Sequence, residues 1–194
     1  TYPNLLTQEG ICGNEEFPDA THNTTLPFTR MLNGAADYTI CYFDKRLRNT
    51  HAHQLAASLV FYSPLQTILW YDTPDRYHGE PEISWFENLA TVFDESRVLS
   101  GYPGKGIVMA RRNGDTWFVG AMANNDGDNV EIDLSFLNPG TSYNATIYTD
   151  GGEKVKTATH VRIDSKKVSA SDRLKFNLMP RGGAAIRIEP AKKS

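Results

Sequence analysis

The chain has 194 residues, of which 40% are hydrophobic and 22% charged, and its formal net charge is −3. These values are ordinary for a globular protein, and no apolar run approaches the ~18 residues that a membrane helix needs. Residues 1–93 hold five basic and eleven acidic side chains, whereas residues 94–194 hold fifteen and twelve. A nucleic-acid partner requires a basic face, so this distribution argues against one.

An acidic loop follows the first apolar run of the chain. Residues 2–6 predict a buried strand, and Glu9, Glu15 and Glu16 come soon after it. Two glycines lie between these carboxylates and permit sharp turns, so the loop can fold Glu15 back toward Glu9. Neighbouring carboxylates either bind a hard cation through oxygen or carry out acid–base chemistry. A solvated acidic loop is the alternative, because surface glutamates are common.

The sequence contains two cysteines, Cys12 and Cys41, which are too few for a disulfide framework. Cys12 belongs to the acidic loop, and Cys41 ends an apolar run that predicts a strand. We interpret both as free or packed thiols, with a disulfide between them as the alternative.

Strands and helices alternate over the rest of residues 1–93. This order is typical of an α/β barrel, in which the chemistry lies on the loops that follow the strands. We therefore expect residues 1–93 to be the C-terminal strands and helices of a (β/α)8 barrel. The predicted elements are a helix over residues 27–33, a strand over 38–43, a helix over 50–62 and a shorter helix over 82–90.

The pattern changes near Phe93, and we place a domain boundary between residues 93 and 94. From Glu95 onward, apolar residues alternate with polar ones and turn signals recur every ~8–12 residues, which indicates an antiparallel sheet. Asn113-Gly114 is a strong hairpin signal. We expect seven or eight strands in a β-sandwich-like domain over residues 94–194. Strand cores are predicted at residues 107–110, 117–123, 130–134, 143–148, 160–163, 174–178 and 185–188.

Short segments spread in order over the chain share a further likeness. They are TYPNLLTQEG at 1–10, GNE at 13–15, LPFTR at 26–30, GAADYT at 34–39, HQLA at 53–56 and FYSPL at 61–65. Together they closely resemble glycoside hydrolase family 97, whose members are calcium-dependent exo-acting α-glucosidases and α-galactosidases. The resemblance implies that the chain is the C-terminal part of such an enzyme. The N-terminal β-sandwich and most of the barrel would then lie upstream.

The same resemblance implies roles for the acidic loop. Glu15 matches the general acid of the family, and Glu9 matches a calcium ligand, with Glu15 as a further ligand of the ion. Protonation of a glycosidic oxygen needs a carboxylic acid of raised pKa. Glu16 is the competitor for the acid role. The nucleophile or base and the remaining calcium ligands would lie upstream of Thr1, so this chain alone is expected to be inactive.

We therefore expect an exo-α-glycoside hydrolase that acts on terminal α-linked sugars of an oligosaccharide. An α-galactosidase is preferred because the loop resembles the retaining branch of the family, and an α-glucosidase is the alternative. A non-catalytic carbohydrate-binding or structural β domain is the alternative from another class. The resemblance also implies a bacterial periplasmic location, and the upstream barrel and N-terminal β-sandwich as partners within the enzyme; we expect no membrane partner.

Three weaker motifs have simpler interpretations. His51 and His53 lie at a predicted helix start with a spacing that does not favour a metal pair, so capping or packing is preferred. Residues 124–129 resemble part of a calcium loop but lack the closing glutamate, and they predict a hairpin turn. Trp70, Tyr71 and Trp85 could form a sugar-stacking wall, although aromatic residues at helix ends are more often part of the core.

Overall fold

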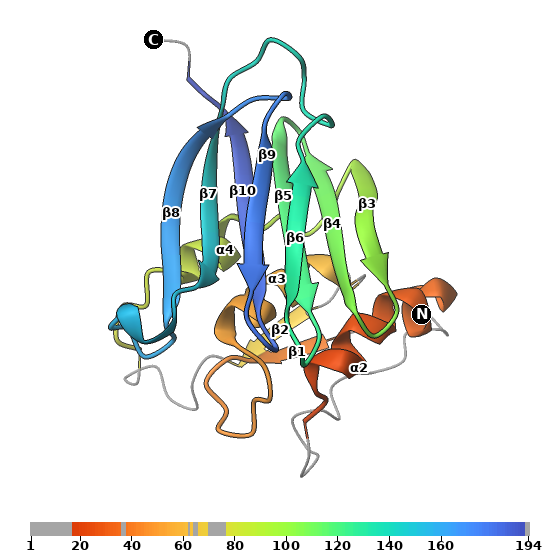
Figure 1. Ribbon diagram of the computed structural model, residues 1–194, viewed down its shortest axis with the longest axis vertical. Helices are drawn as coiled ribbons and strands as arrows, with labels where there is room; N and C mark the ends of the chain where they lie inside the picture. Colours follow the sequence, from red (N-terminus) through yellow and green to blue (C-terminus); the bar gives the residue numbers. More distant parts are fainter. Residues whose placement is uncertain (1–16, 36–37, 62, 64–65, 70–76, 193–194) are drawn as a thin grey trace.

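The computed structural model describes residues 17–35, 38–61, 63, 66–69 and 77–192, and it is mostly β-sheet with few helices (Figure 1). A six-stranded antiparallel sheet has the strand order β3-β4-β5-β10-β7-β8, and β6 pairs antiparallel with β9. The strand bounds are β3 Glu95–Tyr102, β4 Gly106–Asn113, β5 Thr116–Ala123, β6 Asp128–Asp133, β7 Tyr143–Asp150, β8 Val161–Val168, β9 Arg173–Leu178 and β10 Gly183–Pro190. These strands confirm the predicted β-sandwich-like part.

The earlier part of the chain contains short helices and a parallel strand pair. The bounds are α2 Ala20–Thr25, η1 Leu26–Phe28, η2 Arg30–Asn33, β1 Tyr38–Cys41, α3 His51–Val60, β2 Gln66–Leu69 and α4 Ile83–Asn88. A short 3-10 turn, η4 Gly152–Lys154, follows β7. Strands β1 and β2 are parallel, and α3 connects them in the sequence, so these three elements form a βαβ unit. None of the described helices is long and apolar enough to cross a membrane.

The six-stranded sheet is covered on both faces. The β6–β9 pair lies over one face and α3 lies over the other (Figure 1). Alternate residues of β5 therefore enter two cores: Val119 and Ala121 pack toward β6 and β9, whereas Phe118 and Met122 pack toward α3. Every residue of β5 after Thr116 is buried. Because both faces of the sheet are covered here, the residues of β5 after Thr116 are all apolar. An alternation of apolar and polar residues would be expected if one face were exposed to solvent.

Helix α3 lies directly on the backbone of β5 and β10, at two glycines. A Cβ added at Gly120 would lie 2.9 Å from the carbonyl oxygen of Ala56, and one added at Gly183 would lie 2.7 Å from the Cα of His53. Only glycine permits such a close approach. The helix begins after Thr50, whose hydroxyl accepts a hydrogen bond from the backbone N–H of His53 (3.1 Å).

Two local predictions need correction. The first helix begins at Ala20 rather than near Pro27, because Asp19 accepts a 2.8 Å hydrogen bond from the backbone N–H of His22 and caps it. The predicted helix over residues 27–33 is instead two 3-10 turns, which end at Gly34.

The segment 124–129 is not a hairpin turn. It carries the chain from β5 in the large sheet to β6 in the small one, and these two strands are not paired. Asn124 stabilises this segment through two hydrogen bonds. Its side-chain amide donates to the carbonyl of Gly104 (3.1 Å), and its backbone carbonyl accepts from the backbone N–H of Arg181 (2.7 Å). By contrast, the hairpin signal at Asn113-Gly114 is confirmed, since β4 and β5 pair through Asn113 and Thr116.

The boundary between residues 93 and 94 stays a prediction. The core around α3 includes side chains from both sides of that position: Leu55 and Leu59 from the helix, and Phe118 and Tyr148 from the sheet. The two parts of the chain therefore share one core in addition to the separate core between the two sheets.

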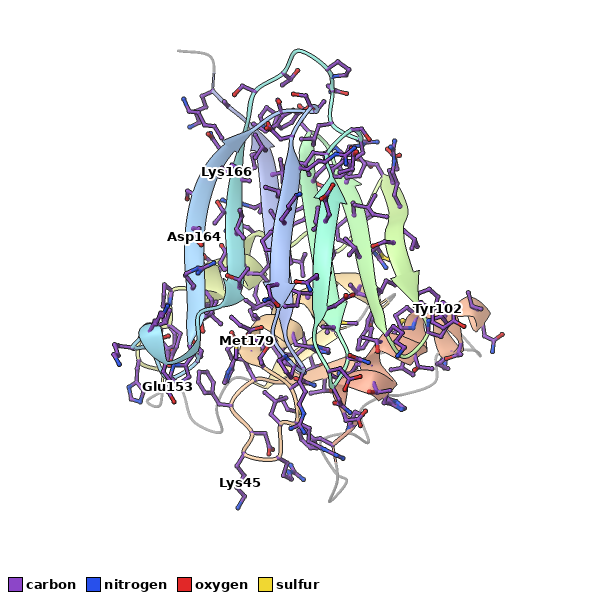
Figure 2. All side chains as sticks on the ribbon, viewed as in Figure 1. Lys45, Tyr102, Glu153, Asp164, Lys166 and Met179 are labelled. Carbon is purple, nitrogen blue, oxygen red and sulfur yellow. The ribbon has the colours of Figure 1, made fainter. Side chains whose placement is uncertain are left out.

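The two edges of the large sheet differ in character. Strand β8 carries Asp164 and Lys166 along its outer edge, whereas Tyr102 stands at the end of β3 on the opposite side (Figure 2). Charged side chains on an edge strand oppose pairing with another strand. On β3, Val98 and Tyr102 are 60% and 69% exposed.

Two histidines of α3 are held in the neutral form by burial. Burial lowers the pKa of His53, which is fully buried, to about 4, against an opposing hydrogen bond with the carbonyl of Gly182. Burial also lowers the pKa of His51 to about 4. Because the unfolded chain takes up these protons near pH 6.5, it binds more protons than the folded chain between pH 6.5 and 4, and stability falls as the pH falls through this range.

We expect the free energy of unfolding of this chain to decrease between pH 7 and pH 4, with up to about 3 kcal/mol of the loss due to His53. Urea unfolding at a series of pH values measures this dependence. A His53→Gln variant should show a flatter pH dependence than the parent, and His22→Gln, which alters an exposed histidine, should not. Equal slopes for His53→Gln and the parent would contradict the assignment of this pH dependence to His53.

Candidate functional site

The carboxylates that the sequence predicts as the catalytic and metal site, Glu9 and Glu15, lie outside the described residues, as does their competitor Glu16. What the structure describes is the carboxyl end of β1, where Cys41 ends the strand and Tyr42 follows it. Cys41 is disulfide-bonded, so its interpretation as a free or packed thiol was wrong. Cys12, the other cysteine of the sequence, also lies outside the described residues.

A largely buried polar cluster follows β1. It is formed by the fully buried Tyr42 and Glu82 and the half-buried His51 and Asp150. The hydroxyl of Tyr42 donates to Glu82 Oε1 at 3.2 Å, and both residues are fully buried. Burial raises the pKa of Tyr42 well above its usual range, and the negative charge of Glu82 raises it further. The imidazole of His51 packs edge-on against the Tyr42 ring, with ring centroids 4.8 Å apart. Tyr42 therefore remains a neutral hydrogen-bond donor.

Asp150 connects the cluster to the sheet. Its Oδ2 accepts a hydrogen bond from the backbone N–H of Gly183 (3.0 Å), at the start of β10. Burial raises the pKa of Asp150, and hydrogen bonds from Thr50 and Gly183 oppose that shift. The backbone N–H of Thr50 also donates to the carbonyl of Arg181 (3.1 Å). The first turn of α3 is thus fixed to the turn between β9 and β10.

The cluster suits support rather than chemistry, because Tyr42 and Glu82 are fully buried and bonded to each other, and Asp150 bonds to the start of β10. Tyr42, Glu82 and Asp150 are not among the site residues that the sequence predicts. One available signal is the aspartate that precedes two glycines at 150–152, a pattern that by itself indicates only a turn. Neither Tyr42 nor Glu82 belongs to a sequence motif that would identify it as part of a site.

The two histidines of α3 do not form a metal pair. His53 Nε2 lies 3.2 Å from the amide nitrogen of Asn23, and its Nδ1 lies 3.2 Å from the carbonyl oxygen of Gly182. Both ring nitrogens of His53 thus make hydrogen-bond contacts within the protein interior. Over the described ranges, no group of three or more histidine, cysteine or acidic side chains is placed to hold a metal ion.

Trp85 belongs to the core rather than to a sugar-binding wall. It is 1% exposed, and its ring meets those of Phe118 and Tyr148 edge-on at 5.9 and 5.7 Å. Its indole N–H donates to the hydroxyl of Ser58 at 2.9 Å. Trp70 lies outside the described residues.

An apolar groove of about 900 Å³ lies beside β2. Its walls come from η2, the end of α3, β2, the segment after α4, and strands β3 and β4. The apolar side chains Leu32, Ile68, Val92 and Val98 line it and are 75%, 39%, 71% and 60% exposed. Exposed apolar surface that gathers in one place usually marks a contact with another part of a protein.

The family model described as "Glycosyl-hydrolase 97 C-terminal, oligomerisation" matches residues 92–189. These residues comprise strands β3 to β10 almost entirely. The match therefore covers the two sheets and about half of the chain.

Similarity to individual proteins extends over nearly the whole chain. A retaining alpha-galactosidase from Bacteroides thetaiotaomicron is 35% identical, and the match covers 97% of this chain and 31% of that protein. A probable retaining alpha-galactosidase from Streptomyces bingchenggensis is 34% identical over 69% of this chain and 22% of its own length. This chain thus spans less than a third of the curated relatives that it matches.

Solved structures show the same likeness. A glycoside hydrolase family 97 enzyme from Pseudoalteromonas sp. strain K8, in complex with panose, matches with a TM-score of 0.84 and 32% identity, over 98% of this chain and 32% of that one. A beta-arabinopyranosidase matches with a TM-score of 0.71 and 26% identity, over 87% of this chain and 27% of that one. The family model and these likenesses establish that the chain belongs to glycoside hydrolase family 97.

Proposed function

We propose that this chain is the C-terminal part of an exo-acting α-galactosidase that removes terminal α-linked sugars from oligosaccharides. The observation that carries the proposal is the 35% identity to a retaining alpha-galactosidase over 97% of the chain. That match continues upstream of the β-sandwich, which argues against a non-catalytic β domain as the whole function. An α-glucosidase of the same family is the alternative.

Residues 1–93 would be the last units of the catalytic (β/α)8 barrel, and residues 94–194 the β domain that follows it. The βαβ unit formed by β1, α3 and β2 supports this division, because a two-stranded parallel sheet is expected only as part of a larger sheet. The apolar groove beside β2 would then receive upstream barrel residues. The N-terminal β-sandwich of the enzyme would lie further upstream.

In this proposal Glu15 is the general acid, and Glu9 and Glu15 are calcium ligands. The family resemblance of the acidic loop supports these roles, and carboxylate oxygens are the donors that calcium prefers. Bound calcium would stabilise the ionised form of a neighbouring carboxylate, so proton donation by Glu15 would require neighbouring acids that raise its pKa. The described residues contribute support: the Tyr42–Glu82 contact and the bonds to Asp150 fix the segments next to the carboxyl end of β1.

A periplasmic location is part of the proposal. The disulfide at Cys41 supports it, because disulfides persist in oxidising compartments such as the bacterial periplasm and are rare in the cytosol.

We expect the isolated chain to associate through the apolar groove. Replacing Val92 and Val98 together with aspartate should reduce that association, measured by sedimentation, because both side chains are exposed there. In the complete enzyme the same double variant should melt roughly 5 °C or more below the parent, since burial of each valine contributes about 1.5–3 kcal/mol. Met179→Asp, at an exposed apolar residue outside the groove, is the control. An unchanged melting temperature in the complete enzyme would show that the groove remains open there.

Glu9→Gln in the complete enzyme should weaken calcium binding, because the amide keeps the shape of the carboxylate but loses its charge. Titration calorimetry measures the affinity, and activity should recover in part with excess calcium. Glu16→Gln changes a neighbouring loop carboxylate and is the matched control. Equal calcium affinity in Glu9→Gln and the parent would remove Glu9 from the ligand set.

Glu15→Gln in the complete enzyme should lose activity according to the leaving group. A sugar leaving group needs a proton as the bond breaks, and general acid catalysis supplies ~10²–10⁴-fold. A nitrophenolate leaves without that proton, so aryl α-galactosides should retain much of their first-step rate while natural α-galactosides lose nearly all of it. Parallel α-galactoside and α-glucoside series identify the sugar. Equal losses on both leaving groups would exclude Glu15 as the acid and make Glu16 the next candidate.

A further inference from the structure

Two of the described residues other than glycine have a positive backbone φ: His160 (53°) and Arg181 (64°). A side chain in this left-handed region costs free energy, so the surrounding structure must hold it there. The side chain of His160 has a structural contact, because its Nδ1 lies 2.8 Å from the carbonyl oxygen of Val155. Arg181 is exposed, and within the described part of the chain its guanidinium forms no hydrogen bond or ion pair.

The turn between β9 and β10, which contains Arg181, is fixed by backbone groups. The N–H of Arg181 donates to the carbonyl of Asn124 (2.7 Å), and the carbonyl of Arg181 accepts from the N–H of Thr50 (3.1 Å). Any residue supplies these two groups, and glycine, which occupies the next two positions, would supply them without strain. The turn itself therefore does not require the side chain of Arg181.

The direction of α3 places this turn at one end of the βαβ unit. Strands β1 and β2 are parallel and α3 connects them, so the helix runs back against the strands and begins at the carboxyl end of β1. Because Thr50 caps the start of α3, its hydrogen bond to Arg181 puts the turn at that same end. Figure 2 shows Met179 of this turn and Lys45 of the segment after β1 at the same end of the molecule.

We propose that Arg181 is a specificity-determining residue that binds the leaving-group part of an oligosaccharide substrate. This inference rests on the proposed function, since the carboxyl ends of the strands carry the catalytic groups in a (β/α)8 barrel. The helices of such a barrel form its outer ring, so Arg181, beside the start of α3, contacts a sugar unit remote from the bond that is cleaved. Its planar guanidinium offers several N–H donors in one fork, which suits a pair of neighbouring sugar hydroxyls.

The test uses the complete enzyme and α-galactosides of increasing length. Arg181→Asn keeps a residue that tolerates positive φ and removes the guanidinium. On trisaccharides and longer α-galactosides it should raise KM about 5- to 10-fold, the effect of losing hydrogen bonds to the substrate, and leave kcat unchanged. On a nitrophenyl α-galactoside, which lacks the remote sugar, KM and kcat should both equal those of the parent.

Arg181→Gly separates substrate contact from stability. Glycine accepts the positive φ without strain, so this variant should melt at or above the melting temperature of the parent and still show the rise in KM. His160→Asn, at the other position of positive φ, is the matched control and should leave KM unchanged on every substrate. Equal changes on short and long substrates, or a lower melting temperature of Arg181→Gly with losses on all of them, would overturn the role of Arg181.

The parent enzyme distinguishes failure of this inference from failure of the proposed function. If the parent cleaves α-glucosides and not α-galactosides, the preferred activity fails, and an α-glucoside series of the same lengths tests Arg181 in the same way. If the parent cleaves α-galactosides and Arg181→Asn keeps the KM of the parent at every length, the proposed function stands and Arg181 has no part in substrate binding.

Discussion

The close contact between α3 and the six-stranded sheet is the constraint on which the rest of the structure depends. Gly120 and Gly183 allow the helix to lie on the backbone of β5 and β10. The buried side chains of the helix pack against those of the sheet. The core formed there joins residues from both parts of the chain. Because protein cores are close-packed, a change at this contact would displace the helix and also the parallel strands on either side of it in the sequence.

Polar contacts extend this constraint from the core to the end of β1. Asp150, Thr50 and His53 connect the start of α3 with the turn that leads into β10. Tyr42 and Glu82 connect the residue after β1 with the start of α4. His53, Tyr42 and Glu82 are fully buried, and a hydrogen bond of a buried group is costly to break because its partner would remain unsatisfied. The sheet is therefore tied by polar contacts to the start of α3, and the residue after β1 is tied to the start of α4.

In this glycoside hydrolase family 97 chain, the six-stranded sheet supports the βαβ unit through packing. The same sheet that packs against β6 and β9 on one face supports α3 on the other. The segment that follows β1 is restrained by the contact between Tyr42 and Glu82, and Cys41 at the end of β1 is disulfide-bonded.

The sequence by itself determined the β-sandwich-like part, including the hairpin at Asn113-Gly114, because local turn chemistry and apolar patterning depend on nearby residues. It also indicated the family, through short segments spread along the chain. The tertiary structure alone decided which strands share a sheet, and it showed that residues 124–129 connect two sheets, since pairing depends on contacts between distant residues. Burial likewise decided that Trp85 and His53 belong to the core. The buried polar cluster was not predictable, because Tyr42, Glu82 and Asp150 come together only when α3 packs on the sheet.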